Sequence, residues 1–335
     1  MRRARKETPR ASNKEIFGWA MFDFANQAYT LLIITVIFPV LFTTVIVGDA
    51  DNDFRLGNLL WSIALSVSYF IVVLSGPVFG AIMDYSALKK KFLFYSYLLT
   101  IISTAFLYFV EPGLVVLGVI LIIISNFAYS IGENFIASFL PSLGPPSDLG
   151  KISGFGWALG YLGGLVAAGF VIVYLGDATA ENFDRIRWVG PYAAFFFMIT
   201  AIPTFLWVKE PGPRKELPEG ETFFSMGFKR LGDTVKEIGS FRDLAIFLIS
   251  VFFAMAGIYI VVSFAFIYGD QVVKWDETVR VLMFVVVQIT AAIGAFSFGF
   301  LQDRFGAKII YNFNTAFVVY WSFGNLGGDR YYSVD

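Results

Sequence analysis

Two acidic side chains lie inside long apolar stretches of this 335-residue sequence, Asp23 and Glu133. Asn26, Gln27 and Thr30 follow Asp23 at helical spacings of three, four and seven residues, so they form one polar stripe. A charged group inside an apolar span is costly unless it is paired or faces water, which makes each acid a functional candidate. Either carboxylate can recognise the amine of a solute or carry a proton. Asp23 has an alternative role as a charge at a helix N-terminus.

Other amides accompany these acids. Asn126, Ser130 and Asn134 lie on a face similar to that of Glu133, and Gln288 lies midway along a later apolar stretch. Gln288 can equally bond a neighbouring helix. The residues predicted for solute binding or proton coupling are Asp23, Asn26, Gln27, Asn126, Glu133 and Gln288.

A short motif occurs twice, 219 positions apart: GAIMDYSALKKKF from Gly80 and GFLQDRFGAKIIY from Gly299. In each copy Asp follows Gly by four residues and Lys by nine. The glycine allows close helix approach, the aspartate can pair with a cation or cap a facing helix, and lysines anchor a loop at anionic headgroups. The alternative interpretation is that the aspartate and the lysines merely mark the end of a helix with charges that set its orientation in the membrane. The candidate residues of this repeated motif are Gly80, Asp84, Lys89, Gly299, Asp303, Arg304 and Lys308.

The chain contains neither Cys nor His, which excludes disulfides, Cys-ligated zinc and imidazole catalysis. It has no Walker-type phosphate loop, so ATP-driven pumping is disfavoured. Its net charge is −1, so nucleic-acid binding is unsupported. We expect no enzyme, no metal and no cofactor.

The elements that must position these residues are transmembrane helices. The chain is 57% hydrophobic and only 15% charged, with a mean hydropathy of +0.69, so its solvent is lipid. A helix crosses the hydrocarbon core with about 20 apolar residues. Suitable continuous stretches occur at 17–47, 58–82, 92–110, 113–140, 153–175, 189–208, 244–268 and 279–301, with a weaker one at 308–323.

The basic residues predict the orientation. With the N-terminus in the cytoplasm, nineteen of the 25 Lys and Arg fall in inner segments, as the positive-inside rule requires. We therefore expect a multi-pass protein of the plasma (inner) membrane with a cytoplasmic N-terminus.

The spans divide into two homologous parts, as in transporters with a central site between repeats. We expect a cytoplasmic tail (1–16), a six-helix half (17–208), a cytoplasmic linker (209–243) with an amphipathic helix near 223–238, a partial second half (244–323) and a polar tail (324–335).

Small residues recur in the fifth and eighth spans, at Gly156, Gly160 and Gly164 and at Ala291, Ala295 and Gly299. Such faces let helix backbones approach closely.

The motif resembles the loop signature Gly-x-Leu-x-Asp-Arg-x-Gly-x-Lys of the major facilitator superfamily, although Tyr85, Ala87 and Leu88 depart from it in the first copy. GWAMFDFANQAYTLLIITVIFPVLF (18–42), ASFLPSL (137–143) and ISGFGWALGYLGGL (152–165) resemble the vacuole effluxer-like branch. The resemblance implies an all-α bundle, a motif that latches the cytoplasmic side, contact of the fifth and eighth spans between the halves, and small solutes such as amino acids.

Members of that branch normally have twelve spans, and we expect eight or nine here, so a truncated reading frame is our leading explanation. The functional hypothesis is a secondary transporter working by alternating access, whose partners are the bilayer and a small solute, and coupling to protons and uniport are both open. The alternative is a truncated, non-transporting membrane protein or scaffold that retains the fold.

Overall fold

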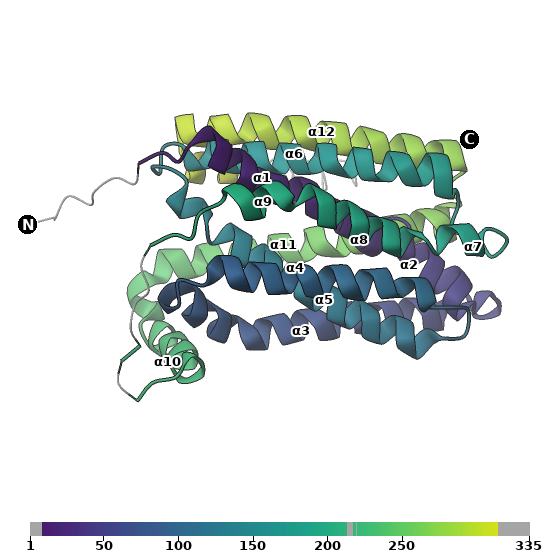
Figure 1. Cartoon of the computed structure of the whole chain (residues 1–335), viewed down its shortest axis with the longest axis horizontal. Coiled ribbons are helices and arrows are strands. Elements are labelled where there is room, and N and C mark those ends of the chain that lie inside the picture. The colour runs from purple at the N-terminus through teal and green to yellow at the C-terminus, as the bar shows by residue number, and fades with distance from the viewer. Residues whose placement is uncertain (1–8, 213–216, 219, 314–335) are drawn as a thin grey trace, which may run out of the picture.

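A computed structural model describes residues 9–212, 217–218 and 220–313. Throughout this part of the chain the regular elements are helices, and eight of them are long and apolar enough to cross a membrane (Figure 1). The prediction of an all-α polytopic bundle is confirmed. The expected tail at 324–335 and most of the weak span at 308–323 lie outside the described residues.

The first six spans follow the predicted ranges within a few residues. The first span joins α1 (Asn13–Ala28) to the π-helical η1 (Tyr29–Thr35), the short α2 (Phe38–Leu41) and η2 (Phe42–Val47). The next four are α3 (Arg55–Tyr85), α4 (Lys89–Phe106), α5 (Val115–Ala137) and α6 (Leu149–Phe170), the last extended by η6 (Val171–Leu175). The sixth follows the short α7 (Phe183–Ile186) and comprises α8 (Val189–Thr200) and α9 (Ile202–Trp207).

The remaining helices begin within the linker at 209–243. They are α10 (Phe223–Lys236), the 3-10 turn η7 (Ile238–Phe241), α11 (Arg242–Tyr268) with η8 (Gly269–Val273), and α12 (Glu277–Phe305). The amphipathic linker helix is thus confirmed as α10, and residues 307–313 are also helical.

Prolines lie in three spans, and two of them coincide with helix starts. Pro39 and Pro203 lie in the first turns of α2 and α9, where the missing backbone N–H costs least. Pro77 lies inside α3, where such interruptions are tolerated in membrane helices.

The first span forms the centre of the bundle. Of its most apolar window 72% is buried, against 0% for the span that contains α11. One face of α1 packs against α6 and another against α8 and α9, while α5 packs on α3 and α4. The opposite face of α6 carries α12, and the two helices run side by side along one edge of the bundle (Figure 1). The helix α1 therefore lies between α6 and the pair α8 and α9, and its side chains reach α5.

Candidate functional site

The two intramembrane acids meet in the centre of the six-helix part. Asn26 on α1 is 2% exposed and donates a hydrogen bond from Nδ2 to Oε1 of Glu133 on α5. Asp23 lies one turn earlier on α1, near enough to Glu133 for the two charges to repel each other. The structure therefore joins Asp23, Asn26 and Glu133, which the sequence presented as two separate groups, into one cluster.

Four further polar side chains extend this cluster along α1 and α5. Thr30 donates a hydrogen bond to the Tyr129 hydroxyl over 2.8 Å, and the hydroxyls of Tyr29 and Ser125 are 2.9 Å apart. The rings of Tyr29 and Tyr129 stack with centroids 4.8 Å apart. Sequence reasoning missed both tyrosines, although Tyr129 precedes Glu133 by four residues and therefore shares its helix face.

Asn126 lies two turns from Glu133 on α5. It is fully buried, and its Nδ2 donates to the Ser68 hydroxyl of α3 over 2.6 Å. Its Oδ1 has no hydrogen-bond partner among the described residues. Asn126 thus ties α5 to α3 and leaves one buried acceptor unsatisfied, which is unusual in a folded protein.

The two predicted glutamines both face the glycine stripe of α6. The Gln27 side chain passes 3.4 Å from the position that a Cβ on Gly160 would take. Gln288 reaches α6 from α12, is 5% exposed, and packs its Nε2 against Gly164 with no hydrogen-bond partner in the described chain. Gln288 therefore joins the central region through α6, across the boundary between the two parts of the chain.

The fifth and eighth spans pack on each other as α6 and α12, as the resemblance implied, but only part of each small-residue stripe lies at that contact. A Cβ on Gly156 would lie 2.8 Å from Oδ2 of Asp23, so Gly156, like Gly160, packs against α1. The contact with α12 uses Gly154, whose Cβ would lie 2.7 Å from the Ala295 carbonyl oxygen. Sequence periodicity identified the small faces but could not say which helix each face meets. Ala291 lies one turn before Ala295 and is half-buried.

The downstream motif copy joins α12 to α6. Both carboxylate oxygens of Asp303 accept hydrogen bonds from the first backbone amides of α6, Gly150 N at 2.9 Å and Lys151 N at 2.8 Å. Next to this contact, a Cβ on Gly299 would lie 2.6 Å from the Gly150 carbonyl oxygen. The carboxylate therefore caps a helix N-terminus, where the helix dipole favours negative charge. Arg304 and Lys308 are exposed, and Arg304 lies over the ring of Phe305.

The upstream motif copy makes different contacts. Asp84 forms an ion pair with Arg230 of α10, and Gly80 has no heavy atom within 4 Å of its would-be Cβ. The prediction that the opening glycine permits close helix packing therefore holds for Gly299 and is wrong for Gly80. Both copies lie at the same end of the bundle, where α10 and the start of α1 also lie (Figure 1).

An acid that sequence reasoning missed caps α4 in the upstream copy. Glu210, just beyond α9, accepts hydrogen bonds from the backbone amides of Lys89 and Lys90, each over 2.8 Å. The Lys89 side chain in turn donates to the Ser138 carbonyl over 3.3 Å. Glu210 therefore caps the N-terminus of α4, as Asp303 caps the N-terminus of α6. The sequence signal that could have identified Glu210 is its position just after a predicted span.

The opposite end of the bundle has its own contact between the two parts of the chain. Asn58 at the start of α3 donates a hydrogen bond to Gln271 of η8 over 2.9 Å. Near this end, a mostly apolar cavity opens between the first span, α6, α11 and α12, with Leu32, Val36, Phe266 and Phe284 in its walls. The hydrogen bond at this end joins two side chains, whereas at the motif end the backbones of α6 and α12 touch and the Asp303 side chain caps α6.

The described residues contain no group of three or more His, Cys, Asp or Glu side chains that could hold a metal ion. The polar cluster instead offers paired carboxylates, amides and phenols, which can bind a polar solute and exchange protons.

Comparisons with known proteins identify the family. The vacuole effluxer Atg22-like family model matches residues 60–149 and 146–328. A major-facilitator-type transporter of Bacillus subtilis, the uncharacterised YxiO, is 28% identical over 303 residues, which cover 88% of this chain and 69% of YxiO. Autophagy-related protein 22-1 of Penicillium rubens is 22% identical over 74% of this chain.

The chain matches only 53% of the length of the Penicillium relative. No solved structure matches the chain significantly. The helical bundle, its repeated motif and the family match agree with one another. The chain belongs to the vacuole effluxer Atg22-like family, a branch of the major facilitator superfamily of membrane proteins.

Proposed function

We propose that the chain is a secondary transporter that moves a small solute across a membrane by alternating access, with its solute site at Asp23, Asn26 and Glu133. The observation that carries the proposal is the contact of Asn26 with Glu133, beside Asp23, in the middle of an otherwise apolar bundle. Two carboxylates in such a place are expensive unless they serve binding or proton movement. Amino acids are the solute class that we propose, because each carries an amine that a carboxylate can bind.

The two ends of the bundle support the alternating-access part of this proposal. At the motif end, α6 and α12 meet at Gly150, Gly154 and Gly299 under the Asp303 cap. At the opposite end, an apolar cavity lies between the same two helices and the first span. A hollow lined by Phe17, Phe155 and Phe296 also opens at the motif end, beside the start of α1. From the backbone contact of α6 with α12 we infer that the two helices are closed against each other at this end. With the N-terminus in the cytoplasm of a plasma (inner) membrane, this closed end is the cytoplasmic one.

Reconstitution tests the site. The full chain in lipid vesicles should exchange radiolabelled amino acids, and Glu133→Gln should abolish exchange while leaving expression and detergent elution unchanged. Asn134→Ala is the matched control, because Asn134 is the next residue but is exposed. Undiminished exchange by Glu133→Gln would remove Glu133 from the mechanism.

A second readout tests proton coupling. A pH-sensitive dye inside the vesicles should report proton movement that accompanies solute uptake in the unaltered protein. If solute moves without any proton signal, the acids bind solute only and the protein is a uniporter.

A further inference from the structure

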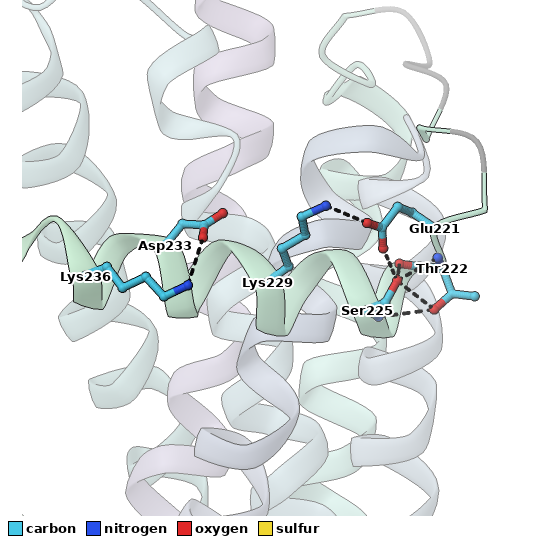
Figure 2. A network of polar contacts seen from close by, with 6 residues as sticks. All are labelled: Glu221, Thr222, Ser225, Lys229, Asp233 and Lys236. Carbon is cyan, nitrogen blue, oxygen red and sulfur yellow. Dashed lines mark hydrogen bonds and ion pairs between the residues drawn. The ribbon is translucent and has the colours of Figure 1, made fainter.

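The linker helix α10 has two unlike exposed faces. Phe224, Phe228, Leu231 and Val235 recur every three or four residues and therefore form one apolar stripe. Their side chains remain 39% to 64% exposed. Lys229, Asp233 and Lys236 lie on the other exposed face, along which Figure 2 shows their ion pairs. A helix with two such faces lies between an apolar environment on one side and water on the other.

The N-terminal turn of α10 is well defined. Thr222 and Ser225 form a reciprocal capping box, with Ser225 N donating to the Thr222 hydroxyl over 3.1 Å (Figure 2). Glu221 accepts hydrogen bonds from Lys229 at 2.8 Å and from Ser225, and these bonds hold the pKa of Glu221 below its usual range. The helix therefore has its own start signal and does not depend on a longer span for its shape.

A third face fixes α10 against α3. Met226 and Gly227 are buried, and Gly227 packs so closely on the Pro77 carbonyl that a side chain there would collide with it. One turn further on, Arg230 pairs with Asp84 and lies 4.8 Å from the ring centre of Tyr85. These contacts hold α10 crosswise to the bundle helices behind it (Figure 2).

We propose that α10 is a membrane-surface helix, which lies along the lipid headgroups at the motif end with its apolar stripe among the acyl chains. The stripe continues the lipid-facing surface of the bundle, because Val73 and Leu74 of α3 are exposed one turn before Pro77, and Leu244 and Phe247 are exposed in the first turns of α11. The crosswise direction places the helix in the membrane plane, and the lysines reach the aqueous side.

Depth-dependent fluorescence quenching tests this proposal. The chain has no cysteine, so Phe228→Cys, Val235→Cys, Lys229→Cys and Lys236→Cys each give one labelling site in the full chain. Each variant would carry an environment-sensitive fluorophore and be reconstituted in vesicles of phosphatidylcholine and phosphatidylglycerol. The pairs 228/229 and 235/236 are matched, since neighbouring residues lie on different faces.

We expect labels at 228 and 235 to emit at shorter wavelength, to be quenched by lipids brominated on their acyl chains, and to show several-fold weaker quenching by aqueous iodide than labels at 229 and 236. Equal iodide quenching at all four sites would place α10 in water and overturn the proposal. Protection of 228 and 235 from both quenchers would show the stripe covered by protein, which also overturns it. All four positions are exposed, so the variants should fold, and monodisperse elution checks this.

Discussion

The two copies of the repeated motif place the same residue types in unlike surroundings. Asp303 binds the backbone amides at the start of α6, whereas Asp84 binds the side chain of Arg230 on the linker helix. Gly299 is pressed against α6, whereas Gly80 faces open space. The difference shows that the motif supplies an acid at a helix end, while the neighbouring helix decides whether that acid becomes a partly buried cap or an exposed ion pair.

The largest expected effect concerns the opening glycines. Gly299→Val should destabilise the protein by about 1–3 kcal/mol or more, because its side chain would collide with the Gly150 backbone. Thermal unfolding in detergent, followed by tryptophan fluorescence, measures the change. Gly80→Val should have little effect, and Gly294→Val on the same helix as Gly299 is the matched control, because nothing lies within 4 Å of its Cβ position. Equal destabilisation by all three would refute the distinction between the copies.

The difference in stability between the two motif copies should be smaller for the aspartate variants than for the glycine variants. Asp303→Asn removes the charge from a helix cap and should cost about 1 kcal/mol, with a similar cost for Glu210→Gln at the start of α4. Asp84→Asn should cost less, since exposed ion pairs contribute about 0–1 kcal/mol and both partners are roughly half exposed. The same unfolding assay ranks the three variants. A larger loss for Asp84→Asn than for Asp303→Asn would reverse our interpretation.

A change in ionic strength should produce the smallest difference in stability between the two motif copies. Raising the ionic strength screens exposed charge pairs, so it should abolish the small stability difference between Arg230→Gln and the unaltered protein. The effect of Asp303→Asn should persist in high salt, because its partners are backbone amides. Unfolding curves at low and high salt measure both, and loss of the Asp303→Asn effect would show it to be a simple surface charge.

The sequence predicted the helices well, because continuous apolar runs bounded by charges leave few alternatives in lipid. It marked Asp23, Asn26 and Glu133 as candidate site residues for the same reason, since polar side chains are rare within apolar runs. It could not predict that Asn26 meets Glu133, because helical periodicity gives the face of each helix and not the neighbour. Gly156 and Gly154 lie two residues apart and contact different helices, a choice that depends on the packing angles of the whole bundle.

Partners outside the spans were harder to predict. Arg230 and Glu210 belong to a charged linker whose seven basic and seven acidic residues gave no preferred pairing. Their roles follow from where α10 and the end of α9 lie in space, beside the ends of α3 and α4.

The most direct test of the account measures the α6–α12 contact at the motif end. Lys151 and Leu301 line one hollow at this contact, and spin labels on Lys151→Cys and Leu301→Cys would report the proximity of α6 and α12 by dipolar broadening in the reconstituted full chain. The account predicts broadened spectra in the parent, a loss of broadening in part of the population with Asp303→Asn, and no change with Asp84→Asn. Spectra that stay broadened in Asp303→Asn, or that change equally in both variants, would contradict the claim that Asp303 holds this end closed.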